Sequence, residues 1–190
     1  SPLRPTRSSP SARRVRRRGS PVSAALPRSS APVSALAEID IAAPRPEVWA
    51  ILADVGSWST WNPAIRGSVR DPDLEIGSKF RFSTEIGTLK CKVTAVDAPH
   101  SLSWKGRVLA LHERQTWLLE PTDTGTHVIV QAEMMGLASR LFRHRLTERL
   151  QAVVDSVVQL LRLEAEMRTV EAEEEAARAA ENERRARAHD

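Results

Sequence analysis

The segment LHERQTWLLE, residues 111–120, contains the polar side chains best suited to chemistry in this chain. Its apolar and polar residues alternate, which predicts a strand whose successive side chains point to opposite faces of a sheet. If Trp117 packs in the interior, the inward face carries Leu111, Glu113, Gln115, Trp117 and Leu119, and the outward face carries His112, Arg114 and Thr116. The segment therefore predicts a glutamate and a glutamine beside a tryptophan, all facing the interior.

Glu113 is the candidate catalytic residue, as a general acid or base. A carboxyl group buried among apolar side chains has a raised pKa because desolvation disfavours its charged form, and a group that titrates near neutral pH exchanges protons readily. Gln115 and, on another strand, Thr84 would orient a bound molecule by hydrogen bonding. The alternative is structural: Glu113 lies near the open end of its strand, solvated or paired with an arginine.

The same alternation in other segments predicts an apolar lining around these polar groups. KFRFSTE, TLKCKVTAV, SLSWKGRV and THVIVQAEM each place apolar residues at every second position. The residues predicted to share the inward face with Glu113 are Phe80, Phe82, Leu89, Cys91, Val93, Leu102, Trp104, Val128 and Val130. An apolar space with a few convergent polar groups is the usual character of a small-molecule site.

Other catalytic chemistries lack their residues in this sequence. The five histidines show no HxH or HExxH spacing, and Cys91 is the single cysteine, so neither a metal site nor an intrachain disulfide is expected. The eight glycines form no GxGxxG loop, and no GxSxG nucleophile motif is present. We therefore expect neither a cofactor nor a metal ion.

The elements that position the site follow from changes in periodicity. ALAEIDIAAP predicts a first strand, PRPEVWAILADV a helix, and SWSTWNPAI a second short helix or turn, before six antiparallel strands between residues 65 and 134. After Gly136 the spacing is helical, and the predicted packing face is Leu137, Leu141, Leu146, Leu150, Val153, Val157 and Leu160. The predicted class is α+β, with a curved antiparallel sheet of about seven strands wrapped around a long C-terminal helix.

Three of the five tryptophans, Trp49, Trp58 and Trp61, lie within 13 positions. Such a cluster stacks sugars or bases in some proteins and forms core in others. No fan of polar residues surrounds it, as a sugar site would require. We therefore interpret Trp58 and Trp61 as packing the short helices under the open end of the sheet, with Asn62-Pro63 turning the chain into the next strand.

The stretch IDIAAPRPEVWAILADVGSWSTWNPAI resembles the opening of the polyketide cyclase/dehydrase-like branch of the START-related helix-grip superfamily (SRPBCC). GSKFRF, SLSWKG and HERQTWLLEPTDTGTHV follow in the family's order, so the resemblance covers about residues 36–163. It implies the helix-grip fold but not an activity, because the superfamily includes lipid carriers, hormone receptors, cyclases and chaperone regulators. By this analogy Trp61 would roof a ligand cavity, and Phe142 and Leu146 would lie where ligand is admitted.

Charge divides the chain into three parts. Residues 1–34 are rich in Arg, Ser and Pro and predict a disordered basic arm, either inert or suited to targeting or to contact with nucleic acid or membrane. Residues 35–163 form the predicted ligand-binding domain. Because residues 38–163 hold 15 basic and 15 acidic residues, nucleic acid is not expected as a partner of this domain. Residues 164–190 predict a charged, solvent-exposed extension of the final helix.

The segment RLFRHRLTER, residues 140–149, combines four arginines with Leu141, Phe142 and Leu146. It would form a lip that contacts anionic lipid or the acidic end of a ligand, or it is a solvated amphipathic helix. No run approaches the roughly 20 apolar residues that span a bilayer, and no secretory signal is recognisable. A cytoplasmic location is expected, with organellar targeting by the arm as the alternative.

Three functions remain open at this level. The first is non-covalent binding of a hydrophobic small molecule, lipid- or polyketide-like, in a cavity between sheet and helix. The second is a cofactor-independent polyketide cyclase, aromatase or dehydratase that uses Glu113. The third is a protein-interaction module built from the basic arm and the charged helix. We expect an apolar small-molecule partner and a monomer or weak dimer.

Overall fold

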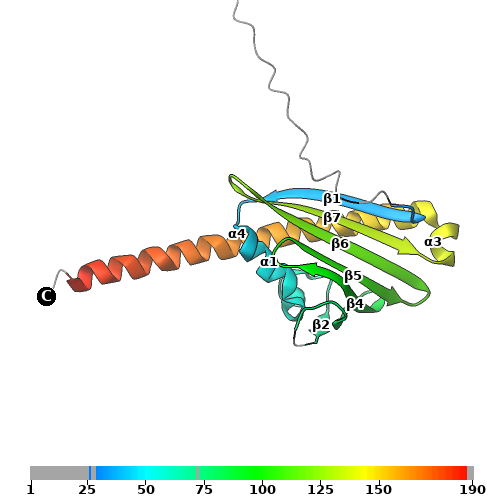
Figure 1. Ribbon diagram of the computed structural model, residues 1–190, viewed down its shortest axis with the longest axis horizontal. Helices are drawn as coiled ribbons and strands as arrows, with labels where there is room; N and C mark the ends of the chain where they lie inside the picture. Colours follow the sequence, from blue (N-terminus) through cyan, green and yellow to red (C-terminus); the bar gives the residue numbers. More distant parts are fainter. Residues whose placement is uncertain (1–25, 27–28, 72, 188–190) are drawn as a thin grey trace, which may run out of the picture.

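The computed structural model describes residues 26, 29–71 and 73–187, which form an antiparallel sheet curved around one long helix (Figure 1). The strands are β1 (Val33–Ile41), β2 (Gly67–Arg70), β3 (Lys79–Thr84), β4 (Gly87–Asp97), β5 (Ser101–Val108), β6 (Leu111–Thr122) and β7 (Gly125–Met135). Their order in the seven-stranded sheet is β1-β7-β6-β5-β4-β3-β2. Successive strands from β2 to β7 are therefore neighbours, and β1 completes the edge by pairing with β7. The predicted fold class is confirmed.

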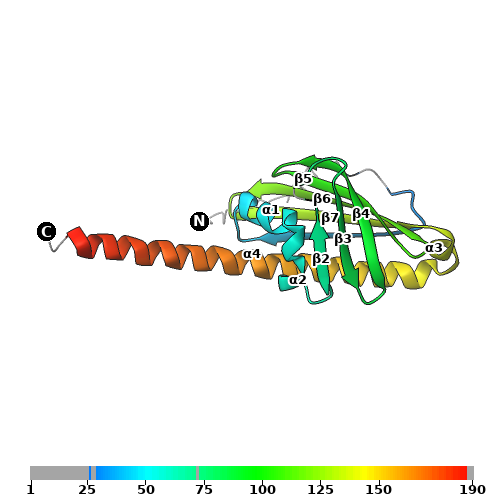
Figure 2. The same ribbon diagram turned by 90° about the horizontal axis from the view of Figure 1, so that it is seen from below.

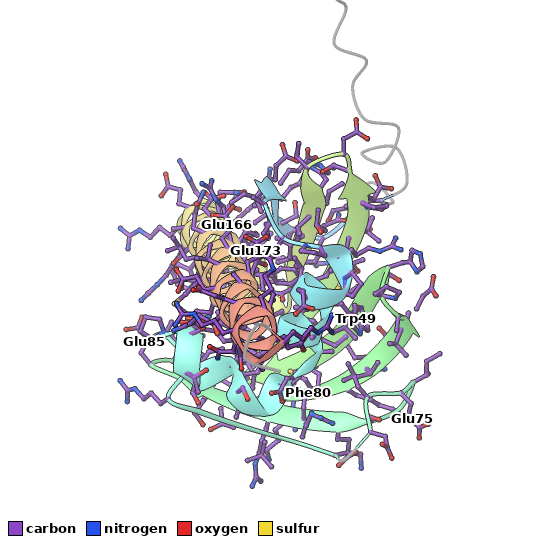
Figure 3. All side chains as sticks on the ribbon, turned by 90° about the vertical axis from the view of Figure 1, so that its left-hand side faces the viewer. Trp49, Glu75, Phe80, Glu85, Glu166 and Glu173 are labelled. Atoms are coloured by element: carbon purple, nitrogen blue, oxygen red, sulfur yellow. The ribbon has the colours of Figure 1, made fainter. Side chains whose placement is uncertain are left out.

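Two groups of helices flank the strands. Between β1 and β2 lie α1 (Arg45–Ala53), the short 3-10 helix η1 (Val55–Ser57) and α2 (Trp58–Trp61), and after β7 come α3 (Leu137–Leu141) and α4 (Arg143–Arg187). Figure 2 shows α4 lying along one side of the sheet, and Figure 3 shows the sheet wrapped around it. The concave face of the sheet and α4 therefore enclose the core between them, and α4 packs against β1, β7 and α1.

The predicted packing face of the last helix is partly wrong. The predicted residues that the structure leaves exposed are Leu137, Leu141 and Val153. The side chains of α4 that face the core are Leu150, Val154, Val158, Leu161 and Ala165, which recur every three or four positions. Leucine and valine occupy two adjoining stripes of this helix, and helical spacing alone does not show which of the two stripes faces the core. The helix is also interrupted at Phe142, so α3 is a separate short helix.

The last part of α4 extends beyond the sheet (Figure 1). Residues 171–187 are exposed, and three ion pairs at i,i+4 spacing link Glu174 to Arg178, Glu181 to Arg185 and Glu183 to Arg187. Each such pair stabilises a helix by only a few tenths of a kcal/mol.

Among the residues that the structure describes, no helix has a stretch long and apolar enough to cross a bilayer.

Deletion of residues 171–190 is expected to shift the unfolding temperature by less than about 2 °C, because the exposed part of this segment packs against none of the sheet. Thermal unfolding followed by near-ultraviolet circular dichroism, which reports on the buried tryptophans, measures this. A much larger fall, or one that depends on protein concentration, would show instead that the segment packs against another chain.

Candidate functional site

Aromatic side chains fill the concave face beside the short helices. Trp58 of α2 contacts Phe80 and Phe82 of β3 and Trp104 of β5, with ring centroids 5.5–5.7 Å apart. The indole Nε1 of Trp58 donates a hydrogen bond of 3.0 Å to the carbonyl oxygen of Leu52. Trp58 and Trp61, both in α2, are buried. The interpretation of Trp58 and Trp61 as packing residues is confirmed, whereas Trp49 is half-buried.

Most of the predicted lining lies on this concave face. Its buried members are Phe80, Leu89, Cys91, Val93, Leu102, Trp104, Trp117, Val128 and Val130. Burial decreases toward the end of the sheet near α3, where Phe82, Thr84 and Leu146 are half-buried. The hydroxyl of Thr84 donates to the carbonyl oxygen of Gly87 at 3.2 Å. The interior is therefore partly accessible to solvent at this end.

Phe142, which is predicted to lie where ligand is admitted, lies on the outer surface of the molecule. It is the C-terminal cap of α3, immediately before α4, and its side chain is 58% exposed. The interruption of the helix changes the direction of the chain at this residue, so Phe142 leaves the face that Leu146 shares with the core. Phe142 belongs to the outer surface at the α3 end.

Glu113 lies in the middle of the sheet, across from Gly106 of β5 and Met134 of β7. It is 7% exposed, and within the described chain its carboxylate takes part in no ion pair. Desolvation by burial raises the pKa of Glu113 from 4.5 to about 7. The solvated or arginine-paired alternative is wrong, because the side chain is buried and, among the described residues, forms no ion pair.

Three side chains on the inward face of β6 form a continuous hydrogen-bonded chain that ends at Glu113. Trp117 Nε1 donates to Gln115 Oε1 at 3.0 Å, and Gln115 Nε2 donates to Glu113 Oε1 at 3.1 Å. Residues two apart on a strand share a face, which brings the three together. The chain fixes the orientation of the Gln115 amide and holds one oxygen of the carboxyl group.

Gly106 and Cys91 form a close contact beside this chain that the sequence analysis did not single out. The two residues pair across β4 and β5, and a Cβ atom at Gly106 would lie 2.8 Å from Cys91 Sγ. The sulfur therefore occupies the space over the glycine, next to Glu113. Burial, and then the Glu113 carboxylate, raise the pKa of Cys91 well above its ordinary value. A glycine at an inward position of SLSWKGRV is the signal that could have indicated this approach.

Two tryptophan N–H groups are buried without an acceptor among the residues that the structure describes. They are Nε1 of Trp104, which is 1% exposed, and Nε1 of Trp61. Trp104 pairs directly with Gln115 across β5 and β6, so its unsatisfied N–H belongs to a residue beside the polar chain. A buried donor without a partner costs about 1–3 kcal/mol of folding free energy. The fold itself does not account for this cost.

Nothing in the described part of the chain suggests a metal centre, since no group of three or more His, Cys, Asp or Glu side chains is arranged to hold an ion. A surface hollow of about 410 Å³ lies outside the sheet, at the start of α4. Its lining is Ser29, Ser30, Ala31, Pro32, Ser34, Arg143 and Thr147. None of the predicted ligand-binding residues belongs to it, so the concave face remains the candidate site.

A comparison with known protein families shows to which family this chain belongs. Residues 32–167 match the family described as polyketide cyclase / dehydrase and lipid transport. The chain belongs to this family. The resemblance noted in the sequence is thereby confirmed, and the family associates the fold with hydrophobic ligands or polyketide cyclisation at a general level. No curated protein matches the chain.

Several solved structures share the fold. A hypothetical protein from Helicobacter pylori has a TM-score of 0.65 at 14% identity, covering 73% of this chain and 90% of that one. The di-domain ARO/CYC protein StfQ of the steffimycin biosynthetic pathway has a TM-score of 0.62 at 17% identity, covering 72% and 51%. A START superfamily protein from Mycobacterium smegmatis has a TM-score of 0.60 at 15% identity, covering 70% and 97%. At these identities the likeness shows the fold alone.

Proposed function

We propose that this protein binds a hydrophobic small molecule, lipid- or polyketide-like, between the concave face of the sheet and α4. The observation that carries the proposal is the buried Trp104 N–H, which has no acceptor among the described residues, beside a buried carboxyl group that has no charge partner there. In the part of the chain that the structure describes, the carboxyl group of Glu113 is buried without a cation, and the Trp104 N–H is buried without an acceptor. Both lower the stability of the empty protein, and a bound molecule with hydrogen-bonding atoms offsets that cost.

The chemistry of these groups describes the ligand. With a pKa of about 7, a large fraction of Glu113 carries a proton near neutral pH, and a protonated carboxyl group donates a hydrogen bond. The Trp104 indole is a donor as well. Two donors in an aromatic surrounding favour an uncharged apolar molecule with a carbonyl or hydroxyl oxygen. Burial of its apolar surface supplies roughly 25 cal/mol per Å², before the cost of association.

Native mass spectrometry of freshly purified protein, followed by solvent extraction, tests this proposal. We expect an apolar molecule with at least one neutral oxygen to remain bound. The Trp104→Phe variant keeps an aromatic ring but loses the N–H and part of the volume of the indole, so it should rebind the extracted molecule at least about fivefold more weakly. Trp49→Phe, on α1, is the matched control and should bind normally. A protein that purifies empty and fails to bind the neutral dye N-phenyl-1-naphthylamine contradicts the proposal.

A second candidate is catalysis by Glu113, which its pKa of about 7 favours because both protonation states are populated near neutral pH. In an intramolecular aldol cyclisation, the carboxylate would take a proton from the carbon between two carbonyl groups. That carbon would then bond to a distant carbonyl carbon, and the proton on Glu113 would pass to the new alkoxide. Loss of water would complete an aromatic ring. Glu113→Gln should abolish turnover of a linear poly-β-keto thioester without loss of folding, whereas a carrier should retain its ligand.

A further inference from the structure

The outer, convex face of strands β3 to β6 carries a basic grid whose positions follow from strand pairing. One row across the four strands is Arg81, Lys90, Arg107 and His112, and the next is Lys79, Lys92, Lys105 and Arg114. All eight side chains are exposed, and they alternate along each strand with the buried residues of the concave face. The basic grid therefore lies on the opposite face of the same strands from the candidate ligand site.

The basic grid does not stabilise the fold. Its like-charged residues stand directly opposite one another, as Lys90 does to Arg107 and Lys92 to Lys105, and such pairs destabilise a sheet. Within the described residues, Arg114 is the one member with a carboxylate partner, Glu133 at 3.7 Å. The net neutrality of the domain conceals this segregation of charge. A surface that costs stability and concentrates positive charge indicates a polyanionic partner.

An exposed apolar tip adjoins the basic grid at the α3 end of the molecule, the right-hand end in Figure 1. Its members are Ile86 in the β3–β4 turn, Leu109 in the β5–β6 turn, Leu137 and Leu141 of α3, and Phe142, with exposures between 43% and 84%. A Cβ atom at Gly136 would lie 2.7 Å from the carbonyl oxygen of Ala110, and one at Gly87 would lie 3.3 Å from Val108. These contacts bring the two turns and the start of α3 together, so the apolar residues share one end of the sheet.

Positive charge borders the apolar tip on two sides, and the exposed Glu85 beside Ile86 is paired with Arg149. Arg107 precedes Leu109 by two residues, and Lys90 follows Ile86 by four. On the other side, the exposed Arg140, Arg143 and Arg145 come from α3 and the start of α4. An apolar centre with a cationic border has the amphipathic character of surfaces that bind at a bilayer interface, where anionic headgroups attract Lys and Arg.

We propose that the α3 end of this protein docks on an anionic lipid bilayer. The apolar tip enters the boundary between headgroups and acyl chains, and the nearer row of the basic grid, with the arginines of α3 and α4, contacts the lipid phosphates. The basic grid holds no tryptophan, tyrosine or phenylalanine on which a nucleic-acid base would stack, its one aromatic ring being the imidazole of His112, and the exposed leucines match a bilayer rather than a phosphate backbone. Docking does not depend on the proposed ligand, although it would place the half-buried margin of the concave face at the membrane.

Co-sedimentation of the full chain with lipid vesicles tests the electrostatic contribution to the proposed membrane docking. We expect binding to phosphatidylcholine vesicles that contain phosphatidylglycerol, weaker binding at higher salt, and little binding to phosphatidylcholine alone. Lys90→Gln with Arg107→Gln should weaken binding roughly fivefold for each charge removed, and should raise the unfolding temperature because a like-charged pair is lost. Arg178→Gln with Arg187→Gln removes the same charge from the far end of α4 and is the matched control.

Leu109→Asn tests the apolar part. Leu109 has a φ of 52°, a conformation that asparagine adopts more readily than leucine, so the variant should be at least as stable as the native protein. Loss of the inserted side chain should weaken vesicle binding about tenfold. The basic arm is common to all variants, so differences between them report on the docking surface. Unchanged vesicle binding by both variants overturns the proposal, as does a Lys90/Arg107 variant that loses a single-stranded oligonucleotide while still binding vesicles.

Discussion

At pH 8 the Glu113→Gln variant is expected to be more stable than the native protein by up to about 3 kcal/mol, and at pH 4 the two should be about equally stable. Burial raises the pKa of Glu113 from 4.5 to about 7. Between these values the folded protein holds a proton that the unfolded chain has released. The stability of the native protein therefore falls as pH rises from about 4.5 to 7 and stays reduced above that. The amide oxygen of a glutamine still accepts the hydrogen bond from Gln115.

Urea denaturation at intervals between pH 4 and pH 8 measures this difference for native and variant protein. Comparison of the two curves cancels the titration of the other carboxyl groups. Glu75→Gln is the matched control, because Glu75 is exposed on the loop before β3 and lies at the outer margin in Figure 3. Parallel pH profiles for the native and Glu113→Gln proteins would show that the folded state keeps Glu113 ionised through a partner or solvent. That outcome would also remove the basis for acid–base catalysis.

Gly106→Ala is expected to destabilise the protein by about 1–3 kcal/mol, because the added methyl group would lie 2.8 Å from Cys91 Sγ in the packed core. Gly106 has no left-handed backbone conformation, so the contact alone causes the effect. Cys91→Ala removes the sulfur and makes room for the methyl group. The double variant should therefore be more stable than the two single changes predict when added together.

A double-mutant cycle by urea denaturation measures this coupling. Gly67→Ala in β2 is the control, since a Cβ atom there would meet nothing within 4 Å. Additive effects of the two core changes would mean that the sulfur and the methyl group do not compete for the same space. Gly106 would then be free to accept a side chain, and the site beside Glu113 would be wider than the native contact indicates.

Alternation along residues 111–120 was enough to predict which side chains of β6 face the interior. Glu113, Gln115 and Trp117 follow from a period of two, and their hydrogen-bonded chain joins residues two positions apart. The tryptophan motif likewise indicated core and the helix-grip fold. Local spacing sufficed in these cases because a strand permits only two directions for its side chains.

The packing face of α4 could not be predicted with the same certainty. Two adjoining stripes of leucine and valine satisfy helical spacing, and contact with β1 and β7 selects the stripe of Val154 and Val158 over that of Val153. The interruption at Phe142 also escaped prediction, and it moves that side chain to the surface. On a helix the buried direction is set by what packs against it, which local spacing does not specify.

The sequence by itself determined the fold, the inward position of Glu113 and the absence of net charge in the domain. The tertiary structure alone decided that, among the described residues, Glu113 has no cation and the Trp104 N–H no acceptor, and that positive charges gather on one outer face. Strand direction and net charge are properties of consecutive residues. Whether a buried polar group has a partner, and whether charged residues form one surface, depends on strands that are far apart in the sequence. These properties therefore arise only when the register of the sheet places those strands side by side.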